Sequence, residues 1–414
     1  MRLAVVDLLF CWPPHGGADV HLYHVMRGLQ AMGQDVRLFV TADASSWERG
    51  AFNPDALPFP ATRLDFSART FTRRRVCKRV REAVDAWAAD AVIVADGFFL
   101  KPWVCDALSD YPLVAQYYAY EAVCHRDILR FKDGAPCPNH FLYTPDACRA
   151  CALARLAPDI RSGLKGAWLQ EYLAARAYAP EYHAMAAQSL ARLDAAIVFN
   201  RNMRDALSGF CPTVFLAPGG VALEAFPYSP PAPESAVKPK TVLMPGRAED
   251  AAKGLAVFQA AGEVLWRERR DFVLHATVPE DTPATEWFRP LPWREHRDVA
   301  RLYAEADIVV VPSLWDEPFG LVAVEAMAVG RPVCASRVGG LQDIVAHLDT
   351  GFLFDRGDAR ELAKQLAVLL DNPDLRRRMG EAGRRRVETE YAWDRVLARH
   401  FTPILAFLAA CEKG

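Results

Sequence analysis

The fold is decided by the stretch EPFGLVAVEAMA, residues 317–328, which follows the apolar run DIVVVP, residues 307–312. The apolar run predicts a buried strand, and the small and apolar residues after Gly320 predict a helix. A strand, a glycine turn and a helix N-terminus together form an anion site, because free N–H groups and the helix dipole face the ligand. Glu317 and Glu325 flank this site. Carboxylates would repel a phosphate itself, but they can accept hydrogen bonds from the neutral sugar hydroxyls beside it. The pattern therefore predicts a site for a nucleotide-sugar.

The composition is that of a globular protein with more than one core. The chain has 414 residues, which favours two domains, and 52% of them are hydrophobic. A charged fraction of 24% with a net charge of −2 argues against a disordered chain and against a nucleic-acid partner. We read no signal peptide in residues 1–7 and no apolar run approaching the roughly 20 residues of a membrane helix. We therefore expect a cytoplasmic protein whose ten cysteines form no disulfides.

Two α/β segments are separated by a proline-rich stretch. Residues 3–9 read as a buried strand, followed by a loop with Gly16 and Gly17, a helix and a second strand, which is typical of a doubly wound, Rossmann-like unit. The same rhythm restarts after residues 226–240, which we interpret as a linker. We expect an N-terminal domain over 1–225, a C-terminal domain over 241–390 and a closing helix over 391–414.

A basic helix is predicted in the N-terminal half. Seven cations fall within residues 69–81, and Val76, Val80 and Val84 mark one apolar face. Such a helix can contact an anionic membrane surface or a phosphate-bearing acceptor. A solvated helix face is the alternative, and both interpretations stay open. The cations are Arg69, Arg73, Arg74, Arg75, Lys78, Arg79 and Arg81.

A cysteine-rich insertion covers residues 124–151, a segment too long for a simple connection. Four thiolates in a reducing compartment fit a closed tetrahedral Zn²⁺ site, which would hold together a loop that lacks its own core. Four free thiols or an iron–sulfur cluster are the alternatives, and His125 and His140 are further candidate ligands. The predicted ligands are Cys124, Cys137, Cys148 and Cys151.

Two cations stand just past a later strand. Arg247 and Lys253 can together neutralise a diphosphate and stabilise a leaving nucleoside diphosphate, although two ordinary surface charges would look the same. With the 317–328 block, these residues make the chain resemble a glycosyltransferase of family 4. Further matches are the loop PPHGG at 13–17 and the run AVGRPV at 328–333. The resemblance implies an α/β protein of the GT-B fold, with two Rossmann-like doubly wound domains facing each other across a cleft.

The resemblance also implies a role for each matching residue. Arg247 and Lys253 would bind the donor diphosphate, Glu317 the sugar hydroxyls and Glu325 the ribose. Members of the family retain the anomeric configuration and need no catalytic metal, because the leaving phosphate takes the proton of the acceptor. The other donor-binding residues that the resemblance implies are Gly16, Gly17, Gly246, Trp293, Phe319, Gly320 and Leu321.

One segment departs from the family pattern. Residues 112–124 match a family segment at Tyr120 and Cys124, but Tyr118 and Ala119 replace its His-Asp pair, whose His contacts the donor sugar. Tyr118 can still donate a hydrogen bond through its hydroxyl, so it is a fourth catalytic candidate.

Two functions follow from these patterns. The first is a retaining glycosyltransferase that moves a sugar from a UDP- or GDP-sugar to a glycan, a lipid-linked acceptor or a small molecule. The alternative is a catalytically impaired partner subunit that binds a nucleotide-sugar. A nicotinamide dehydrogenase fits poorly, because the G-x-G-x-x-G fingerprint is missing.

Overall fold

The computed structural model describes residues 1–43, 49–163, 166–230, 239–279, 281–292 and 296–411. The chain divides into two compact units, and each is described here by itself. Unit 1 comprises Met1–Arg130, Cys137–Pro218 and Leu397–Gly414. Unit 2 comprises Phe131–Pro136 and Gly219–Val396.

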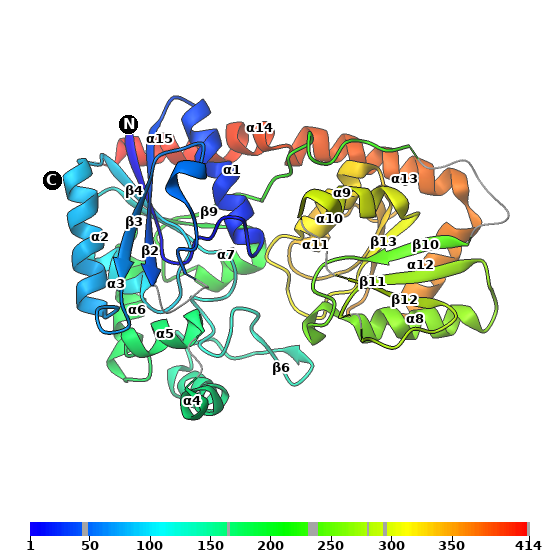
Figure 1. Cartoon of the computed structure of the whole chain (residues 1–414), viewed down its shortest axis with the longest axis horizontal. Coiled ribbons are helices and arrows are strands. Elements are labelled where there is room, and N and C mark those ends of the chain that lie inside the picture. Colours follow the sequence, from blue (N-terminus) through cyan, green and yellow to red (C-terminus); the bar gives the residue numbers. More distant parts are fainter. Residues whose placement is uncertain (44–48, 164–165, 231–238, 280, 293–295, 412–414) are drawn as a thin grey trace. The chain divides into compact units, whose positions relative to one another are not determined.

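Unit 1 is built on a parallel sheet of seven described strands in the order β3-β2-β1-β4-β5-β8-β9 (Figure 1). The inner strands are buried along nearly their whole length. Helices cover both faces of a parallel sheet, so its strands consist of continuous apolar runs. The strands are β1 (Arg2–Asp7), β2 (Asp35–Asp43), β3 (Ala61–Phe66), β4 (Ala91–Val94), β5 (Leu113–Gln116), β8 (Ala195–Val198) and β9 (Val214–Leu216).

Helices cover both faces of this sheet, with α1 on one face and α2 on the other (Figure 1). Helices α2, α3 and α6 pack in a row, and the apolar stripe of α2 is buried as the periodicity predicts. The helical segments are α1 (Gly17–Ala31), η1 (Pro54–Ala56), α2 (Arg73–Trp87), α3 (Lys101–Ala107), α4 (Pro145–Ser162), α5 (Ala167–Ala174), α6 (Glu181–Arg192) and α7 (Arg201–Leu207).

Unit 2 repeats this plan with a parallel sheet of six described strands in the order β12-β11-β10-β13-β14-β15. A separate short antiparallel pair, β6 (Phe131–Lys132) with β7 (Ala135–Pro136), comes from the cysteine-rich insertion. The strands of the main sheet are β10 (Lys240–Met244), β11 (Phe272–Thr277), β12 (Phe288–Leu291), β13 (Ile308–Val311), β14 (Val333–Ser336) and β15 (Gly351–Phe354).

Helices α8 and α12 pack together against one face of this sheet, and α9 and α10 pack together on the other (Figure 1). The core between sheet and helices is almost wholly aliphatic and aromatic. The helical segments are η2 (Ala251–Lys253), α8 (Leu255–Trp266), α9 (His296–Glu305), α10 (Leu321–Val329), α11 (Leu341–Ile344), α12 (Ala359–Asp371), α13 (Pro373–Arg386), η3 (Val387–Tyr391) and α14 (Trp393–Val396).

Each sheet has one point at which the direction of winding reverses. In unit 1 this switch point lies between β1 and β4, and in unit 2 it lies between β10 and β13. In open α/β sheets, ligands bind outside the carboxyl ends of the two strands at such a point, because the connections leave it in opposite directions. The topology therefore gives each unit one expected ligand position.

The closing segment differs from the single helix predicted over 391–414. It is divided into η3, α14, η4 (Leu397–Phe401) and α15 (Thr402–Ala410), and η3 and η4 are π-helical turns. In unit 1, the side chain of Leu397 fills the space that a Cβ at Gly28 would need, and Phe407 packs edge-on against Phe215. The last part of the chain is therefore anchored on unit 1 by close packing.

The predicted linker over 226–240 lies partly outside the described residues. Its first part packs within unit 2, where Ser229 N–H donates to the Val329 carbonyl at 3.1 Å and Tyr228 lies against Gly330. Its last residue, Lys240, already belongs to β10. Within the described ranges, no helix combines the length and the apolar character needed to cross a bilayer.

A buried ion pair ties the elements of unit 1 together. The Arg49 guanidinium lies 3.0 Å from Glu171 Oε1, and both side chains are fully buried. Arg49 also donates to the Leu8 carbonyl after β1, while Glu171 Oε2 accepts the N–H groups of Phe98 at 2.9 Å and Leu100 at 3.0 Å. One pair thus joins the ends of β1 and β4 to α5.

We predict that Glu171→Ala destabilises the protein by about 3–5 kcal/mol, because it leaves the Arg49 charge buried without its partner. The free energy of unfolding in denaturant measures this. Glu82→Ala in α2 is the control, since Glu82 pairs with Lys78 at the exposed surface, and it should change stability by less than about 1 kcal/mol. Equal effects of the two substitutions would contradict the role given to the buried pair.

Candidate functional site

The predicted donor residues of unit 2 gather at its switch point. Gly246 and Arg247 follow β10, and η2 ends at Lys253. Glu317 follows β13. Because β10 and β13 are neighbouring parallel strands, their carboxyl ends bring these two loops together.

Glu317 is the centre of this cluster. Its Oε1 atom accepts hydrogen bonds from Lys253 Nζ at 2.8 Å, Ser313 Oγ at 2.6 Å and Trp315 Nε1 at 2.9 Å. The side chain of Glu317 is only 10% exposed, so these contacts form away from bulk water, where charge-assisted bonds are strong. The two predicted donor-site residues Lys253 and Glu317 are therefore in direct contact.

Both the side chain and the backbone at Lys253 are held in place. The ammonium of Lys253 lies 4.8 Å from the centroid of the Trp315 ring, within cation–π distance. The next residue, Gly254, has φ of +84°, and a Cβ there would lie 2.0 Å from the Pro312 carbonyl oxygen. Only glycine fits such a contact, which fixes η2 against the end of β13.

The turn at Gly320 opens α10 without a side-chain cap. Gly320 has φ of +121°, and a Cβ there would lie 2.6 Å from Leu341. A hydrogen bond also fixes the turn, because the Gly340 N–H donates to the Glu317 carbonyl at 2.7 Å. An uncapped helix start of this kind offers N–H groups and a positive dipole end to an anion.

Glu325 lies one helical turn further along α10 and is buried. Its Oε2 atom accepts the Tyr303 hydroxyl of α9 at 2.8 Å. Burial and the charge of Glu325 together hold the pKa of Tyr303 well above its usual range, so the phenol remains a donor. Tyr303 thereby orients the carboxylate of Glu325.

The remaining predicted donor residues of unit 2 differ in exposure and in whether the structure describes them. Arg247 is exposed and makes no ion pair with any described residue, which leaves its guanidinium available to a ligand. Trp293 lies outside the described residues. Phe319 is buried, and Leu321 begins α10. Sequence reasoning missed Ser313, Trp315 and Tyr303, although the first two lie within four residues of Glu317.

Gly16 and Gly17 belong to unit 1, at the start of α1. The carboxylate of Asp19 accepts the N–H groups of Cys11 at 3.0 Å, His15 at 2.9 Å and Gly16 at 3.2 Å. The N–H of Gly16, a donor-binding residue according to the resemblance, thus already donates to a side chain at the start of α1. A Cβ at Gly16 would meet no atom within 4 Å.

Tyr118 also belongs to unit 1, in the loop after β5. Its hydroxyl lies 3.3 Å from His21 Nδ1. The carboxylate of Glu121 accepts the N–H groups of Tyr118 at 3.0 Å and Ala119 at 2.8 Å, and Lys101 pairs with Glu121 at 3.4 Å. A buried ion pair therefore fixes the two residues that replace the His-Asp pair.

The predicted zinc site is not present in the described residues. No group of three or more His, Cys, Asp or Glu side chains there has positions suited to hold a metal ion. The Sγ atom of Cys148 instead contacts Thr144 Oγ1 at 3.7 Å, and that of Cys151 contacts Arg126 at 4.0 Å. Burial raises the pKa of Cys124 to about 12, which favours the neutral thiol. The described structure therefore does not support the metal site that the cysteine spacing predicts, and the zinc site stays a prediction.

The insertion packs its apolar side chains into the core of unit 1. Phe141 and Cys148 are part of the main hydrophobic cluster of unit 1. The two histidines considered as ligands are also engaged: His125 stacks on Phe141 with ring centroids 3.4 Å apart, and His140 Nε2 contacts the Ala206 carbonyl at 2.8 Å. The insertion therefore has apolar contacts with unit 1 that can hold it in place.

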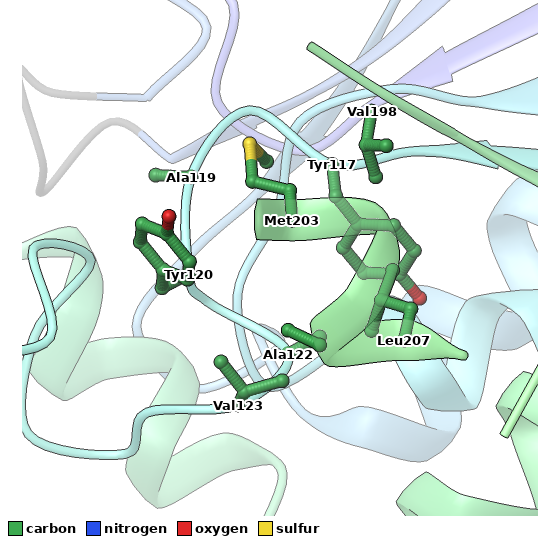
Figure 2. Close-up of a pocket in the computed structure, with 9 residues that line it drawn as sticks. Tyr117, Ala119, Tyr120, Ala122, Val123, Val198, Met203 and Leu207 are labelled. Carbon is green, nitrogen blue, oxygen red and sulfur yellow. The ribbon is translucent and has the colours of Figure 1, made fainter. Parts of the chain in front are cut away.

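Figure 2 shows a small pocket beside the same loop, between residues 117–123 and α7. It encloses about 200 Å³ of empty space, part of it open to solvent. Aliphatic and aromatic side chains line it, so it offers few hydrogen-bonding groups to a sugar. We assign no ligand to it. Its lining residues are Tyr117, Ala119, Tyr120, Ala122, Val123, Val198, Met203, Ala206 and Leu207.

Comparison with known proteins finds similarity to one protein family and to several solved structures. Residues 288–386 match the family Glycosyl transferases group 1, and this range contains Glu317 and Glu325. Solved structures with similar folds cover almost the whole chain. A sucrose-phosphate synthase from Thermosynechococcus elongatus aligns with a TM-score of 0.66 and 21% identity, covering 99% of this chain and 100% of that one. Anabaena HepE in complex with UDP aligns with a TM-score of 0.67 and 14% identity, covering 98% and 100%.

These likenesses confirm the predicted fold class, an α/β GT-B fold with two Rossmann-like domains. Curated relatives match over shorter segments. A D-inositol 3-phosphate glycosyltransferase of Corynebacterium efficiens is 49% identical over 88 residues, which is 21% of this chain and 20% of that protein. An N-acetyl-alpha-D-glucosaminyl L-malate synthase of Bacillus anthracis is 38% identical over 105 residues, 25% and 27% of the two chains. The chain thus spans only 20% and 27% of the lengths of these two relatives.

We predict that the cysteine-rich insertion keeps its stability without metal, because its apolar side chains pack into the core of unit 1. Adding a strong chelator should leave the melting temperature unchanged, and Cys151→Ser should cost no more than about 1 kcal/mol. Elemental analysis measures the metal content, and thermal unfolding measures the melting temperature and the effect of Cys151→Ser. Cys411→Ser is the control outside the insertion. About one zinc per chain, together with a melting temperature that falls on chelation, would contradict this arrangement.

Proposed function

We propose that the chain is a glycosyltransferase that moves a sugar from a nucleotide-sugar to an acceptor hydroxyl, with retention of the anomeric configuration. Unit 2 would bind the donor and unit 1 the acceptor. The observation that carries the proposal is the contact of Lys253 with Glu317 at the switch point of unit 2. The family match over residues 288–386 supports it, because that range includes Glu317 and the whole of α10.

Binding of the donor diphosphate would use three positive features. Lys253 is 28% exposed, so its ammonium can reach a ligand while still touching Glu317. Arg247 is exposed on the loop after β10, and the uncapped start of α10 adds N–H groups and the helix dipole. Such donors stabilise a diphosphate more as it leaves than in the ground state, because its charge grows.

The two carboxylates would orient the neutral parts of the donor. Glu317, held by three donors on one oxygen, would accept sugar hydroxyls. Glu325, oriented by Tyr303, would hold the ribose. The base is assigned to the segment around Trp293, and the backbone at Gly246, Phe319, Gly320 and Leu321 to the phosphates and sugar.

The reaction itself would need no catalytic metal. In a front-face transfer the leaving phosphate takes the proton of the acceptor hydroxyl, so the protein supplies binding, orientation and charge stabilisation. UDP is the first donor nucleotide to test, since Anabaena HepE was solved with UDP, and GDP is the second. The acceptor is a glycan, a lipid-linked sugar or a small molecule.

We further propose that α2 brings the protein to an anionic membrane surface from the cytoplasmic side. Arg74, Arg75, Lys78 and Arg79 are exposed along one helix, while its three valines are buried against the sheet. Arginines at the start of a helix oppose its dipole and cost stability, which favours a binding role for them. With its apolar face buried, α2 would bind through charge alone.

The donor site gives a direct prediction. Lys253→Ala removes a cation from the diphosphate and leaves Glu317 to repel it, so the affinity for UDP or GDP should fall roughly 30-fold or more. Calorimetric titration measures the dissociation constant. The double variant with Glu317→Ala should lose less than the sum of the two single effects, because the two residues act as a pair.

Lys364→Ala, an exposed lysine on α12, is the matched control and should leave the affinity unchanged. Full affinity in Lys253→Ala would contradict the proposed donor site. Tight donor binding without transfer to any acceptor in a broad panel would instead favour the catalytically impaired partner subunit.

The membrane proposal predicts that the protein floats with vesicles containing anionic phosphatidylglycerol and not with phosphatidylcholine alone. Replacing Arg74, Arg75 and Lys78 by Gln should weaken partitioning roughly 100-fold, since each cation contributes about 1 kcal/mol. Replacing Arg377 and Arg378 on α13 by Gln is the control. Binding that survives both the α2 substitutions and a high salt concentration would contradict an electrostatic contact through α2.

A further inference from the structure

Helix α4 of unit 1 carries large apolar side chains that face solvent. Its inner side is buried at Cys148, Ala152 and Leu156, which hold the helix on the hydrophobic core of unit 1. Away from this core, Leu153 is 40% exposed and Ile160 is 45% exposed. Figure 1 shows α4 end-on, outside the other helices of unit 1. The outer side of α4 is therefore apolar as well as the inner side.

The exposed apolar side chains form one continuous surface along α4. Residues three, four and seven positions apart lie on the same face of a helix. Of the eight large hydrophobic side chains that are exposed among the described residues, five fall within residues 143–178, so the exposure is concentrated here. A contiguous apolar patch of this kind indicates an interaction site. The surface includes Ala147, Ala150, Leu153, Ala154, Ala157 and Ile160.

A charge of opposite sign lies at each end of this apolar surface. Asp146 stands at its N-terminal end, and its carboxylate is 87% exposed although it pairs with Arg149 at 2.7 Å. Arg161 is exposed at the C-terminal end. Both lie on the face of Leu153, because one precedes it and the other follows it by about two helical turns. The outer face of α4 thus has an acidic end, an apolar middle and a basic end.

Two α4 helices that run antiparallel match this pattern in one alignment. Asp146 of each copy then lies beside Arg161 of the other, so both ends of the contact join opposite charges. The same alignment places Ala150 opposite Ala157, so the backbones can approach closely, and brings the two Leu153 side chains together at the middle. A parallel pair would instead put like charges together and set the helix dipoles in the same direction.

We propose that the outer face of α4 is the contact between two copies of this chain, which pair about a two-fold axis through antiparallel α4 helices. Each contact then occurs twice, as in any symmetric dimer. Because α4 has 18 residues and is about 27 Å long, the contact is smaller than the interface of a permanent dimer. The dimer should therefore form with a dissociation constant of about 1–100 µM. It does not depend on the proposed glycosyltransferase function.

Sedimentation equilibrium of the whole protein between about 1 and 300 µM measures this dissociation constant. Leu153→Asp brings two carboxylates together at the middle of the contact and should raise the dissociation constant at least about tenfold. Val368→Asp makes the same kind of change at an exposed apolar residue of α12 and should leave it unaltered. A protein that stays monomeric throughout, or a dimer that Leu153→Asp does not weaken, would overturn the proposal.

Two charge-reversal variants test the antiparallel alignment. Asp146→Arg sets arginine against arginine at both ends of the contact, and Arg161→Asp sets aspartate against aspartate. Each variant alone should dimerise at least about tenfold more weakly than the unchanged protein. An equimolar mixture of the two should recover the original affinity, because opposite charges then meet at both ends, and this recovery also shows that both variants fold. A mixture that dimerises no better than the separate variants would overturn the proposal.

A lipid surface is the other occupant that an apolar helix face can have. Vesicles of phosphatidylcholine, which carry no net charge, distinguish it from a second copy of the chain. We expect the protein not to float with these vesicles, because α4 is covered by its copy. Flotation that Leu153→Asp abolishes would overturn the proposal in favour of a lipid contact.

Discussion

The structure of unit 2 at its ligand edge depends on one oxygen atom, Oε1 of Glu317, which accepts hydrogen bonds from Lys253, Ser313 and Trp315. Because Lys253 follows β10 and the other two follow β13, this atom joins the two strands at the switch point. A largely buried carboxylate with a charged partner is stable only when its hydrogen bonds are satisfied, so the two loops are held in one arrangement before any ligand arrives. The cation proposed to bind a diphosphate is thus positioned in advance.

The same topological rule gives the two units different polar groups. At the switch point of unit 2 the accessible charges are positive, from Arg247 and Lys253, and α10 begins without a cap. At that of unit 1 two carboxyl groups lie together, Asp7 and Asp96, and burial raises the pKa of both, while Asp19 accepts N–H groups at the helix N-terminus. Two sheets of similar plan therefore present different chemistry, which suits a charged donor in one and a hydroxyl-bearing acceptor in the other.

The fold was largely predictable, because it depends on local patterns. Apolar runs with turns between them predicted the parallel strands, and the small and apolar residues after Gly320 predicted α10. The contacts of Ser313 and Trp315 could not be predicted, since they depend on how the turn after β13 folds back. The hydrogen bonds of Asp19 to the 11–16 loop could not be predicted either, because they depend on the path of the backbone. Cysteine spacing predicted a zinc site, but it could not show that Phe141 and Cys148 pack into the core of unit 1.

The central claim is that a nucleoside diphosphate binds at the carboxyl edge of β10 and β13. Hydrogen–deuterium exchange of the whole protein, with and without UDP or GDP, tests it most directly, because bound phosphates protect the amides that they contact. The account predicts slower exchange in residues 246–254 and 313–324 with one of the two nucleotides, and unchanged exchange along α2. Protection confined to other segments, or no protection with either nucleotide at saturating concentration, would contradict it.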